Sequence, residues 1–346
     1  MNERDLIAHI RQLADAEADG LLQGIGDDCA VIAKDRDTVW LLTMDTLTES
    51  VHFNCAWHPP KLLGRKAVSV NVSDIAAMGG KPVFALLSLS LPADFDPHWA
   101  DRLSRGITGA CQEYGCLLIG GDTVRSRDIS LTLTVIGEMQ RDQVLYRHTA
   151  EPGDTIFVSG PLGYSAAGLA LLQSGRYAGT MEQGVAACPS ALQPFIKAHL
   201  NPWARVDLVP LLARTGLIHA MMDLSDGLAT DLSHLCQQSG TGARIEEDRL
   251  PGRSALAAAA AALPDAAVTD WITNWMTVGG EDYELLFTAA SADTETLLRI
   301  TGEQQLPVYP IGTITKGQNV TLVRQTEHGA DEQRISFQGF DHFSRK

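Results

Sequence analysis

The chain has 346 residues, 45% of them hydrophobic, and its 42 acidic and 27 basic residues give a net charge of −15. This length predicts two globular domains, and the acidic balance, with no basic stripe along the chain, argues against nucleic acid as a partner. The longest apolar run, Ala255–Leu263, is far shorter than the roughly 20 residues of a membrane span. Because the charged N-terminus also lacks the apolar core of a signal peptide, we expect a cytoplasmic protein without membrane contact.

The first 150 residues predict alternating helices and strands. Hydrophobic periodicity and breaker residues indicate helices over residues 6–13, 60–78 and 97–114, and strands over residues 38–44, 83–91, 117–119 and 129–137. Asp74 then lies on the last turns of the second helix. The short strand over 117–119 is expected to be buried, and it runs into Gly120-Gly121-Asp122. This half is therefore expected to have an α/β arrangement.

A turn at Glu151–Asp154 and the strand TIFVS after it open a second unit. We expect the domain boundary near residue 150, with an N-terminal domain over 1–150 and a C-terminal domain over 151–346. In the second domain the pattern predicts helices at 163–172, after Pro202, at 228–238 and at 254–263, and strands ending at Asp223 and around 283–288, 308–314 and 320–324. The predicted fold class is α/β in both domains.

Aspartates recur at the ends of apolar runs, beside glycine or another small residue. The segments are GIGDD (Gly24–Asp28), TMD (Thr43–Asp45), NVSD (Asn71–Asp74), GGD (Gly120–Asp122) and MDLSDG (Met222–Gly227). Carboxylates about 4 Å apart repel by about 4 kcal/mol per pair at an effective dielectric near 20, so such a group stays ionised only around cations. A Mg²⁺-nucleotide site is the natural interpretation.

The common nucleotide-binding motifs are missing. No segment matches the P-loop, Gly24-Ile25-Gly26 lacks the third glycine of a dinucleotide fingerprint, and the protein-kinase signatures are absent. If the chain handles ATP, its phosphate charge must be neutralised mainly by Mg²⁺ held on aspartates, since Mg²⁺ prefers oxygen ligands.

Eight segments together resemble the thiamine-monophosphate kinase family. They are GIGDDCAVI, TMDTLTESVHF, GRKAVSVNVSDIAAMGGKP, GGDT, RHTAEPGD, GPLGYSAAGLALL, MDLSDGL and GGEDYELLF, in family order and nearly end to end. The wider superfamily includes aminoimidazole ribonucleotide synthetase, selenophosphate synthetase and a hydrogenase maturation factor. The resemblance implies two α/β domains with mixed sheets, a homodimer in which the N-terminal sheets of two subunits form a β-barrel, and ATP-dependent phosphorylation of thiamine monophosphate to thiamine diphosphate.

The resemblance also implies roles for individual residues. The implied Mg²⁺ ligands are Asp28, Thr43, Asp45, Asp74, Asp122 and Asp223, with Asp226 on a further ion, and Asp45, Asp74 and Asp122 are the expected catalytic set. The implied ATP contacts are Gly121, Asp122, Arg147 and Ser225. The implied thiamine phosphate contacts are His52, Glu281 and Phe340. The family often has a second hydroxyl residue before the aspartate of TMD, and Met44 stands there in this chain.

Elementary chemistry agrees with several of these roles. Arg147 offers a planar fork to phosphate oxygens, and Gly121 lets backbone approach a nucleotide closely. Phe340 would pack against a cationic thiazolium ring, and Glu281 would offset its charge. Phosphoryl transfer needs mainly positioning and charge neutralisation, and an acceptor that is already an ionised phosphate needs no dedicated general base.

Alternatives remain open at this stage. Asp27 is better explained by the turn, Asp226 would equally serve as the N-cap of the helix at Leu228, and Lys66 is either a solvated helix charge or a phosphate contact. Asp282 and Glu284 are expected to be structural. One rival function is a sister enzyme of the superfamily. Selenophosphate synthetase would need a reactive cysteine or its replacement in a glycine-rich N-terminal segment, and the hydrogenase factor a C-terminal cysteine, and neither feature is found. The other rival function is a non-catalytic acidic metal-binding scaffold.

Overall fold

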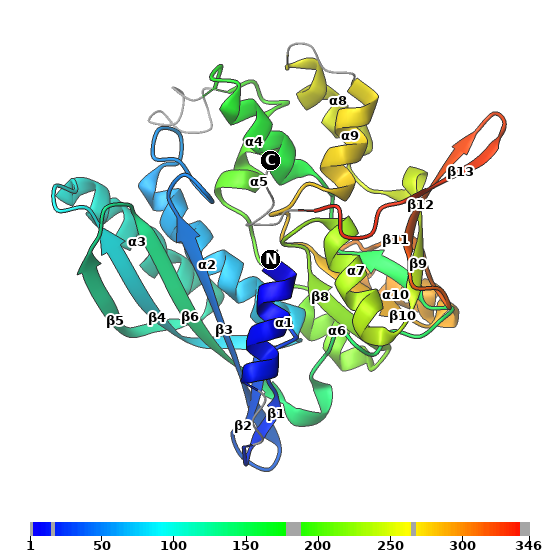
Figure 1. Cartoon of the computed structure of the whole chain (residues 1–346), viewed down its shortest axis with the longest axis horizontal. Helices are drawn as coiled ribbons and strands as arrows, with labels where there is room; N and C mark the ends of the chain where they lie inside the picture. The colour runs from blue at the N-terminus through cyan, green and yellow to red at the C-terminus, as the bar shows by residue number, and fades with distance from the viewer. Residues whose placement is uncertain (1–2, 15–17, 178–187, 264–267, 340–346) are drawn as a thin grey trace.

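The computed structural model of the chain describes residues 3–14, 18–177, 188–263 and 268–339. Two sheets and the helices around them make up the molecule (Figure 1). In the first part of the chain the elements are α1 (Glu3–Leu13), β1 (Leu21–Gln23), β2 (Ala30–Ala33), β3 (Thr38–Thr48), α2 (Pro60–Ala77), β4 (Lys81–Leu91), α3 (Pro97–Tyr114), β5 (Leu117–Arg125) and β6 (Ser130–Gln140).

The second part of the chain contains more and shorter elements. They are β7 (Thr155–Val158), α4 (Tyr164–Gln173), α5 (Gln193–Leu200), α6 (Val209–Thr215), β8 (Ile218–Asp223), α7 (Leu228–Ser239), β9 (Gly242–Glu246), α8 (Arg253–Ala261), α9 (Val268–Thr277), β10 (Leu285–Ala289), α10 (Thr294–Glu303), β11 (Tyr309–Thr315), β12 (Val320–Thr326) and β13 (Gly329–Arg334). The predicted α/β class with mixed sheets is confirmed.

The first sheet has the strand order β1-β2-β3-β6-β4-β5, in which only the β4–β5 pair is parallel. Strands β3 and β6 largely alternate in burial, because one face of the sheet packs on α2 and the other does not. Leu41, Leu131 and Leu133 are fully buried, whereas Met44 on the opposite face is 65% exposed. Within the described part of the chain this sheet stays open and forms no barrel.

Strand β5 differs from the prediction. It runs to Arg125 instead of ending near Ile119, and it is exposed along its whole length as the edge strand of the sheet. Leu117 is 63% exposed and Ile119 55% exposed. Its apolar sequence is typical of a buried strand, but it pairs on one side alone, with β4.

Helix α2 is buried on nearly all sides. It packs against α3, β3 and β6 of the first half and against β8 and α5 of the second. Its buried residues accordingly include polar ones, among them Lys66, Asn71 and Ser73. A helix that is enclosed all round needs partners for every polar side chain, so α2 presents polar groups to the junction between the two halves.

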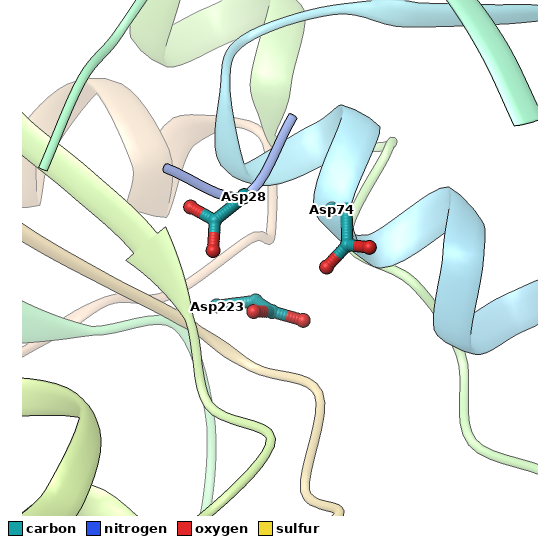
Figure 2. Close-up of side chains that lie close together, drawn as sticks. All are labelled: Asp28, Asp74 and Asp223. Carbon is teal, nitrogen blue, oxygen red and sulfur yellow. The ribbon is translucent and has the colours of Figure 1, made fainter. Parts of the chain in front are cut away.

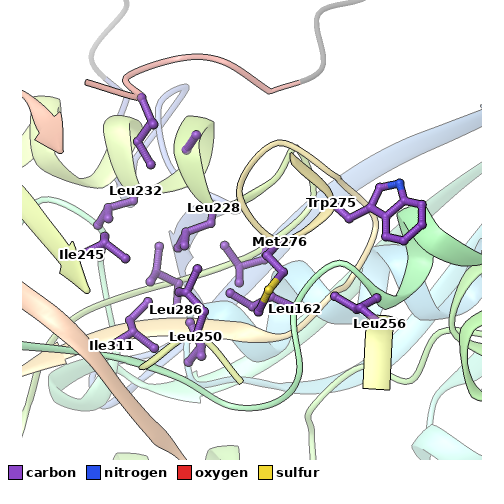
Figure 3. Packing of buried hydrophobic residues seen from close by; sticks show 14 of the residues in the cluster. Leu162, Leu228, Leu232, Ile245, Leu250, Leu256, Trp275, Met276, Leu286 and Ile311 are labelled. Carbon is purple, nitrogen blue, oxygen red and sulfur yellow. The ribbon is translucent and has the colours of Figure 1, made fainter. Parts of the chain in front are cut away.

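The second sheet has the order β13-β12-β9-β11-β7-β10-β8, in which β12 and β9 are parallel and the other neighbours antiparallel. Figure 3 shows the core between this sheet and α7, where Leu228 and Leu232 pack against Ile245, Leu286 and Ile311. Five elements that the sequence analysis did not predict belong to this half: α5, β9, α9, α10 and β13.

The pairing of β8 with β10 sets the position of the site. Asp223 is opposite Leu285 in the register, and the backbone N–H of Leu224 donates to the carbonyl of Glu284 at 2.9 Å. This antiparallel pair brings the MDLSDG segment beside the GGEDYE segment, although the two are far apart in the chain. Within the described residues, no helix is long and apolar enough to cross a membrane.

Candidate active site

Three aspartates from separate segments meet at one point. Asp28 precedes β2, Asp74 lies on the last turn of α2 and Asp223 ends β8. One carboxylate oxygen from each lies within 4.8 Å of the others, and Figure 2 shows the three carboxylates turned toward a common space. We call Asp28, Asp74 and Asp223 the acidic cluster.

Neighbouring side chains orient these carboxylates. The Thr43 hydroxyl donates to Asp74 Oδ2, and the Ser73 hydroxyl donates to Asp223 Oδ2, each at 2.5 Å. Beside them, the Asn71 side-chain oxygen accepts the backbone N–H of Asp45 at 2.8 Å. Each of these two hydroxyls satisfies one oxygen of Asp74 or Asp223 and so fixes the orientation of that carboxylate.

The electrostatics of the cluster favour a bound cation. Burial raises the pKa of Asp74 well above its ordinary value, and repulsion from Asp45 and Asp223 raises it further. Burial raises the pKa of Asp28 in the same way, although the Arg147 guanidinium lowers it in part. Burial, with Asp223 as neighbour, raises the pKa of Asp45 to about 6. The charge of Asp45 therefore interacts with the carboxylates of the acidic cluster.

The donor set fits a hard divalent cation such as Mg²⁺. All the ligand atoms are oxygens, which Mg²⁺ prefers, and Asp28 Oδ2 is buried without a hydrogen-bond partner in the described part of the chain. A buried carboxylate oxygen in that state is destabilising unless an ion or water satisfies it.

Arg147 and Asp27 form a pair beside the cluster. The Arg147 guanidinium contacts Asp28 and also donates through Nε to Asp27 Oδ1 at 3.2 Å. Asp27 in addition accepts the backbone N–H of Asp28 at 3.0 Å, as expected of a residue that serves the turn. The structure thus places Arg147 against carboxylates, next to the cluster.

Asp122 does not join the acidic cluster. Along one row of the sheet Asp45 pairs with Leu133, Leu133 with Leu87 and Leu87 with Gly121, so three strand spacings, about 14 Å in total, separate β3 from β5. Asp122 itself pairs with Ser88, one position further along. Its side chain therefore points to the opposite face of the sheet from Asp45.

Gly121 has a structural reason to be glycine. A Cβ built at this position would lie 1.8 Å from the carbonyl oxygen of Leu87 on β4. No side chain is tolerated at that distance, so the close approach of two strands explains the residue without a nucleotide.

Next to the cluster lies a cavity of about 810 Å³. Six of the expected site residues line it: Asp45, His52, Asp74, Ser225, Asp226 and Glu281. Aromatic side chains contribute to its wall, among them Trp57, Trp271, Trp275 and Tyr283. A cavity lined by both carboxylates and aromatic rings suits a ligand with a metal-bound phosphate group and an aromatic part.

The segment that carries Glu281 has an unusual backbone. Glu281 and Tyr283 have φ values of 66° and 51°, which side-chain-bearing residues seldom adopt. Asp282 between them accepts the backbone N–H groups of Gly163 and Ser165, at 2.5 and 3.1 Å, at the start of α4. A positive φ at such residues persists only where surrounding contacts, here those of Asp282, hold the backbone in place. The structural role expected of Asp282 is confirmed.

The contacts of Asp226 and Lys66 exclude one of the two roles considered for each. The N-cap of α7 is Gly227, and Asp231 accepts the backbone N–H groups of Asp226 and Gly227 at 3.1 and 3.0 Å. The N-cap interpretation of Asp226 is therefore wrong, and Asp226 lines the cavity instead. Lys66 is not solvated, since its side chain is 0% exposed and pairs with Glu281.

Several contributors were not predicted from the sequence. Asn71, Ser73 and Asp231 orient or adjoin the cluster, and His199 contacts Glu281 at 3.1 Å. The signal for Asn71 and Ser73 was their place in the NVSD segment, whereas α5, which carries His199, has no such motif. Phe340, expected at the substrate site, lies outside the described residues.

Comparisons with known proteins agree with this arrangement. Residues 26–139 match the model of the AIR synthase related protein N-terminal domain, and residues 151–325 match that of its C-terminal domain. The thiamine-monophosphate kinase of Bacillus subtilis (strain 168) is 33% identical over 99% of this chain and 100% of that protein. The Escherichia coli (strain K12) thiamine-monophosphate kinase is 36% identical over 93% of this chain and 92% of that protein.

A solved structure shows the same architecture. It is described as AaThiL complexed with AMPPCP and TMP, and it matches with a TM-score of 0.81 and 32% identity over 99% of this chain and 97% of that one. With two relatives above 30% identity over almost their full lengths, the chain belongs to the thiamine-monophosphate kinase family of AIR synthase related proteins.

Proposed function

We propose that this protein transfers the terminal phosphate of ATP to thiamine monophosphate and so forms thiamine diphosphate. The observation that carries the proposal is the acidic cluster beside a cavity with aromatic residues in its wall, which Asp74 also lines. The named activity of the full-length relatives, and the ATP analogue and TMP in the matching structure, support it. We also propose the cytoplasm as its location, because ATP is the phosphate donor.

In this proposal Asp28, Asp45, Asp74 and Asp223 hold Mg²⁺. The bound ions supply positive charge that neutralises the phosphate oxygens during transfer. Thr43 and Ser73 keep the carboxylates in position through their hydrogen bonds. Ser225 and Asp226 face the same cavity, where they would contact ATP and a further ion. Arg147 would reach phosphate by exchanging one of its carboxylate partners.

The acceptor occupies this same cavity in the proposal, with its phosphate toward Asp45 and Asp74. His52 lines the wall there, and its Nδ1 accepts the backbone N–H of Thr48 at 3.0 Å, so the proton is on Nε2. An Nε2–H donor suits a phosphate oxygen of the acceptor. Because that phosphate is ionised before transfer, no side chain needs to remove a proton from it, and positioning is the main task of the protein.

We further propose a homodimer, with the domain boundary near residue 150. The uncovered face and edge of the first sheet expose Met44, Leu86, Leu117, Leu118, Ile119 and Val124. An exposed apolar patch at an unpaired edge favours association, and a second copy of the same sheet would cover it. Asp122 lies on this uncovered face. If it is a ligand, we infer that it completes the site of the partner subunit.

The test measures ADP release with thiamine monophosphate as acceptor, against free thiamine and aminoimidazole precursors. We expect Mg²⁺-dependent ADP release that thiamine monophosphate alone stimulates. Absence of that stimulation would refute the assignment. An acidic scaffold without catalysis would instead bind Mg²⁺ in equilibrium dialysis and show no binding of ATP.

A further inference from the structure

A largely buried charged triad forms part of the cavity wall, apart from the acidic cluster. Lys66 Nζ lies 2.8 Å from Glu281 Oε1, and His199 Nδ1 lies 3.1 Å from Glu281 Oε2. The side chains of Lys66 and His199 are 0% and 3% exposed, whereas that of Glu281 is 24% exposed and lines the cavity. His199 also lines the cavity, but Glu281 is the most exposed member of the triad and presents the most surface to a ligand.

The triad joins elements from both halves of the chain. Lys66 comes from α2, His199 from α5, and Glu281 from the strained segment before β10. Ser165 on α4 adds a hydroxyl 3.2 Å from His199 Nδ1. Four separately placed segments therefore determine where the Glu281 carboxylate points.

The chemistry of the contacts fixes the protonation states. An ionised carboxylate can only accept hydrogen bonds, so the Nδ1 of His199 carries the proton that faces it. Burial raises the pKa of Glu281, but the Lys66 ammonium and the His199 ring lower it by more, and the result is below the ordinary value. Burial and the charge of Lys66 lower the pKa of His199, which keeps the ring neutral.

The charges of the triad then cancel. One positive Lys66, one negative Glu281 and a neutral His199 leave no net charge at this part of the wall. His58, whose ring centre is 6.4 Å from that of His199, is also neutral, because burial lowers its pKa. What Glu281 offers to a ligand is therefore a fixed hydrogen-bond acceptor, and its value in offsetting a cationic ring is small.

The position of Lys66 along α2 places the triad where the organic end of the acceptor would lie. Lys66 and Asp74 are eight residues apart on α2, and therefore about 12 Å apart along its axis and about 80° apart around it, within one broad face of the helix. Phosphate chemistry at Asp74 places the far end of an extended ligand near Glu281. In thiamine monophosphate that end is the aminopyrimidine ring, whose exocyclic amino group is a hydrogen-bond donor.

We propose that Lys66 and His199 are positioning residues that hold Glu281 as a charge-compensated acceptor for the amino group of the aminopyrimidine ring. The inference rests on the proposed function, and it identifies which part of the acceptor the triad reads. A site with a buried acceptor discriminates strongly against an analogue that lacks the donor, since the acceptor is then left unpaired.

The test compares thiamine monophosphate with oxythiamine monophosphate, in which a carbonyl oxygen replaces the amino group. In the wild-type protein we expect kcat/KM to favour the amino compound by at least about tenfold. Lys66→Met should raise KM for thiamine monophosphate by about tenfold or more and reduce the discrimination, with KM for ATP changed less than about twofold. An unchanged KM for thiamine monophosphate, or an equal rise for ATP, would overturn the inference.

A double-variant cycle separates positioning from general stability. If Lys66 acts through Glu281, adding Lys66→Met to Glu281→Gln should leave KM for thiamine monophosphate as it is in Glu281→Gln alone. The double variant removes both charges, so it remains foldable even if Lys66→Met is not. A further rise in KM in the double variant would contradict the proposal.

The matched control is Glu247→Gln, which perturbs another buried carboxylate, paired with Arg253 and Arg324 away from the cavity. This variant should have a lower melting temperature but the same discrimination between thiamine monophosphate and oxythiamine monophosphate as the wild type. A wild-type protein that releases no ADP with thiamine monophosphate refutes the proposed function and the inference with it. An active wild type whose discrimination survives Lys66→Met refutes the inference alone.

Discussion

A dimer that combines two different inactive chains tests whether Asp122 contributes to the active site of the partner subunit. Within one chain, three strand spacings of about 4.8 Å put β5 about 14 Å from β3, and Asp122 points to the opposite face of the sheet from Asp45. A Mg²⁺ ligand lies about 2.1 Å from its ion. The two aspartates of one chain therefore cannot hold the same ion or adjacent ions.

The perturbation combines Asp45→Asn with Asp122→Asn on differently tagged chains. Each variant alone should be inactive, because each loses an expected ligand. In the mixed dimer one site carries both substitutions and the other carries neither, if Asp122 acts across the interface. We therefore expect about half of the wild-type turnover per dimer, since a two-fold dimer has two equivalent sites.

The assay is ADP release after tandem affinity purification of the co-expressed chains. The control is a mixed dimer of Asp45→Asn with Asp74→Asn, two residues that line the same cavity of one chain, and it should stay inactive. Absence of recovery in the Asp45 and Asp122 pair would refute the assignment of Asp122 to the partner's site. Failure to capture any mixed dimer would refute the dimer itself.

Three further predictions follow from contacts within the chain. The pKa of Asp45, about 6, lies above its ordinary value of 3.8, so the metal-free protein should lose up to about 3 kcal/mol of stability as pH rises from 4 to 6. Mg²⁺ should then raise the melting temperature more at pH 8 than at pH 5, and an equal shift at both would contradict this. Asp282→Ala should lower the free energy of unfolding in urea by about 1–3 kcal/mol, and Asp282→Asn, which keeps the acceptor oxygen, by less; equal losses would argue against the contact with α4. Gly121→Ala, with its Cβ against Leu87, should lower the free energy of unfolding in urea by several kcal/mol. Normal stability combined with weakened ATP binding would instead support a nucleotide-binding role for Gly121.

The sign of the pH effect follows from the direction of the shift. A carboxyl group whose pKa is higher in the folded state binds more protons there than in the unfolded chain. Its contribution is therefore favourable at low pH and is lost as pH rises through the folded value. Asp28, Asp74 and Asp223 have raised pKa values for the same reason, burial, so they act in the same direction.

The sequence by itself determined the local elements and most of the acidic set. Helix α3 was predicted at its observed bounds because its apolar period and its flanking Asp96 and Gly115 are local signals. The recurrence of aspartate after apolar runs identified Asp28, Asp74 and Asp223 as one group. These features depend on residues close in the chain, and local patterns report them reliably.

Only the tertiary structure decided what depends on partners far away in the chain. The sequence of β5 indicates a buried strand, yet its position at the sheet edge exposes it and carries Asp122 away from the other carboxylates. The sequence leaves Lys66 as either a solvated helix charge or a phosphate contact, whereas in the fold α5 and the segment before β10 enclose it with His199 and Glu281. Burial and charge pairing are properties of the assembled fold, because the groups that desolvate a side chain or compensate its charge come from other segments.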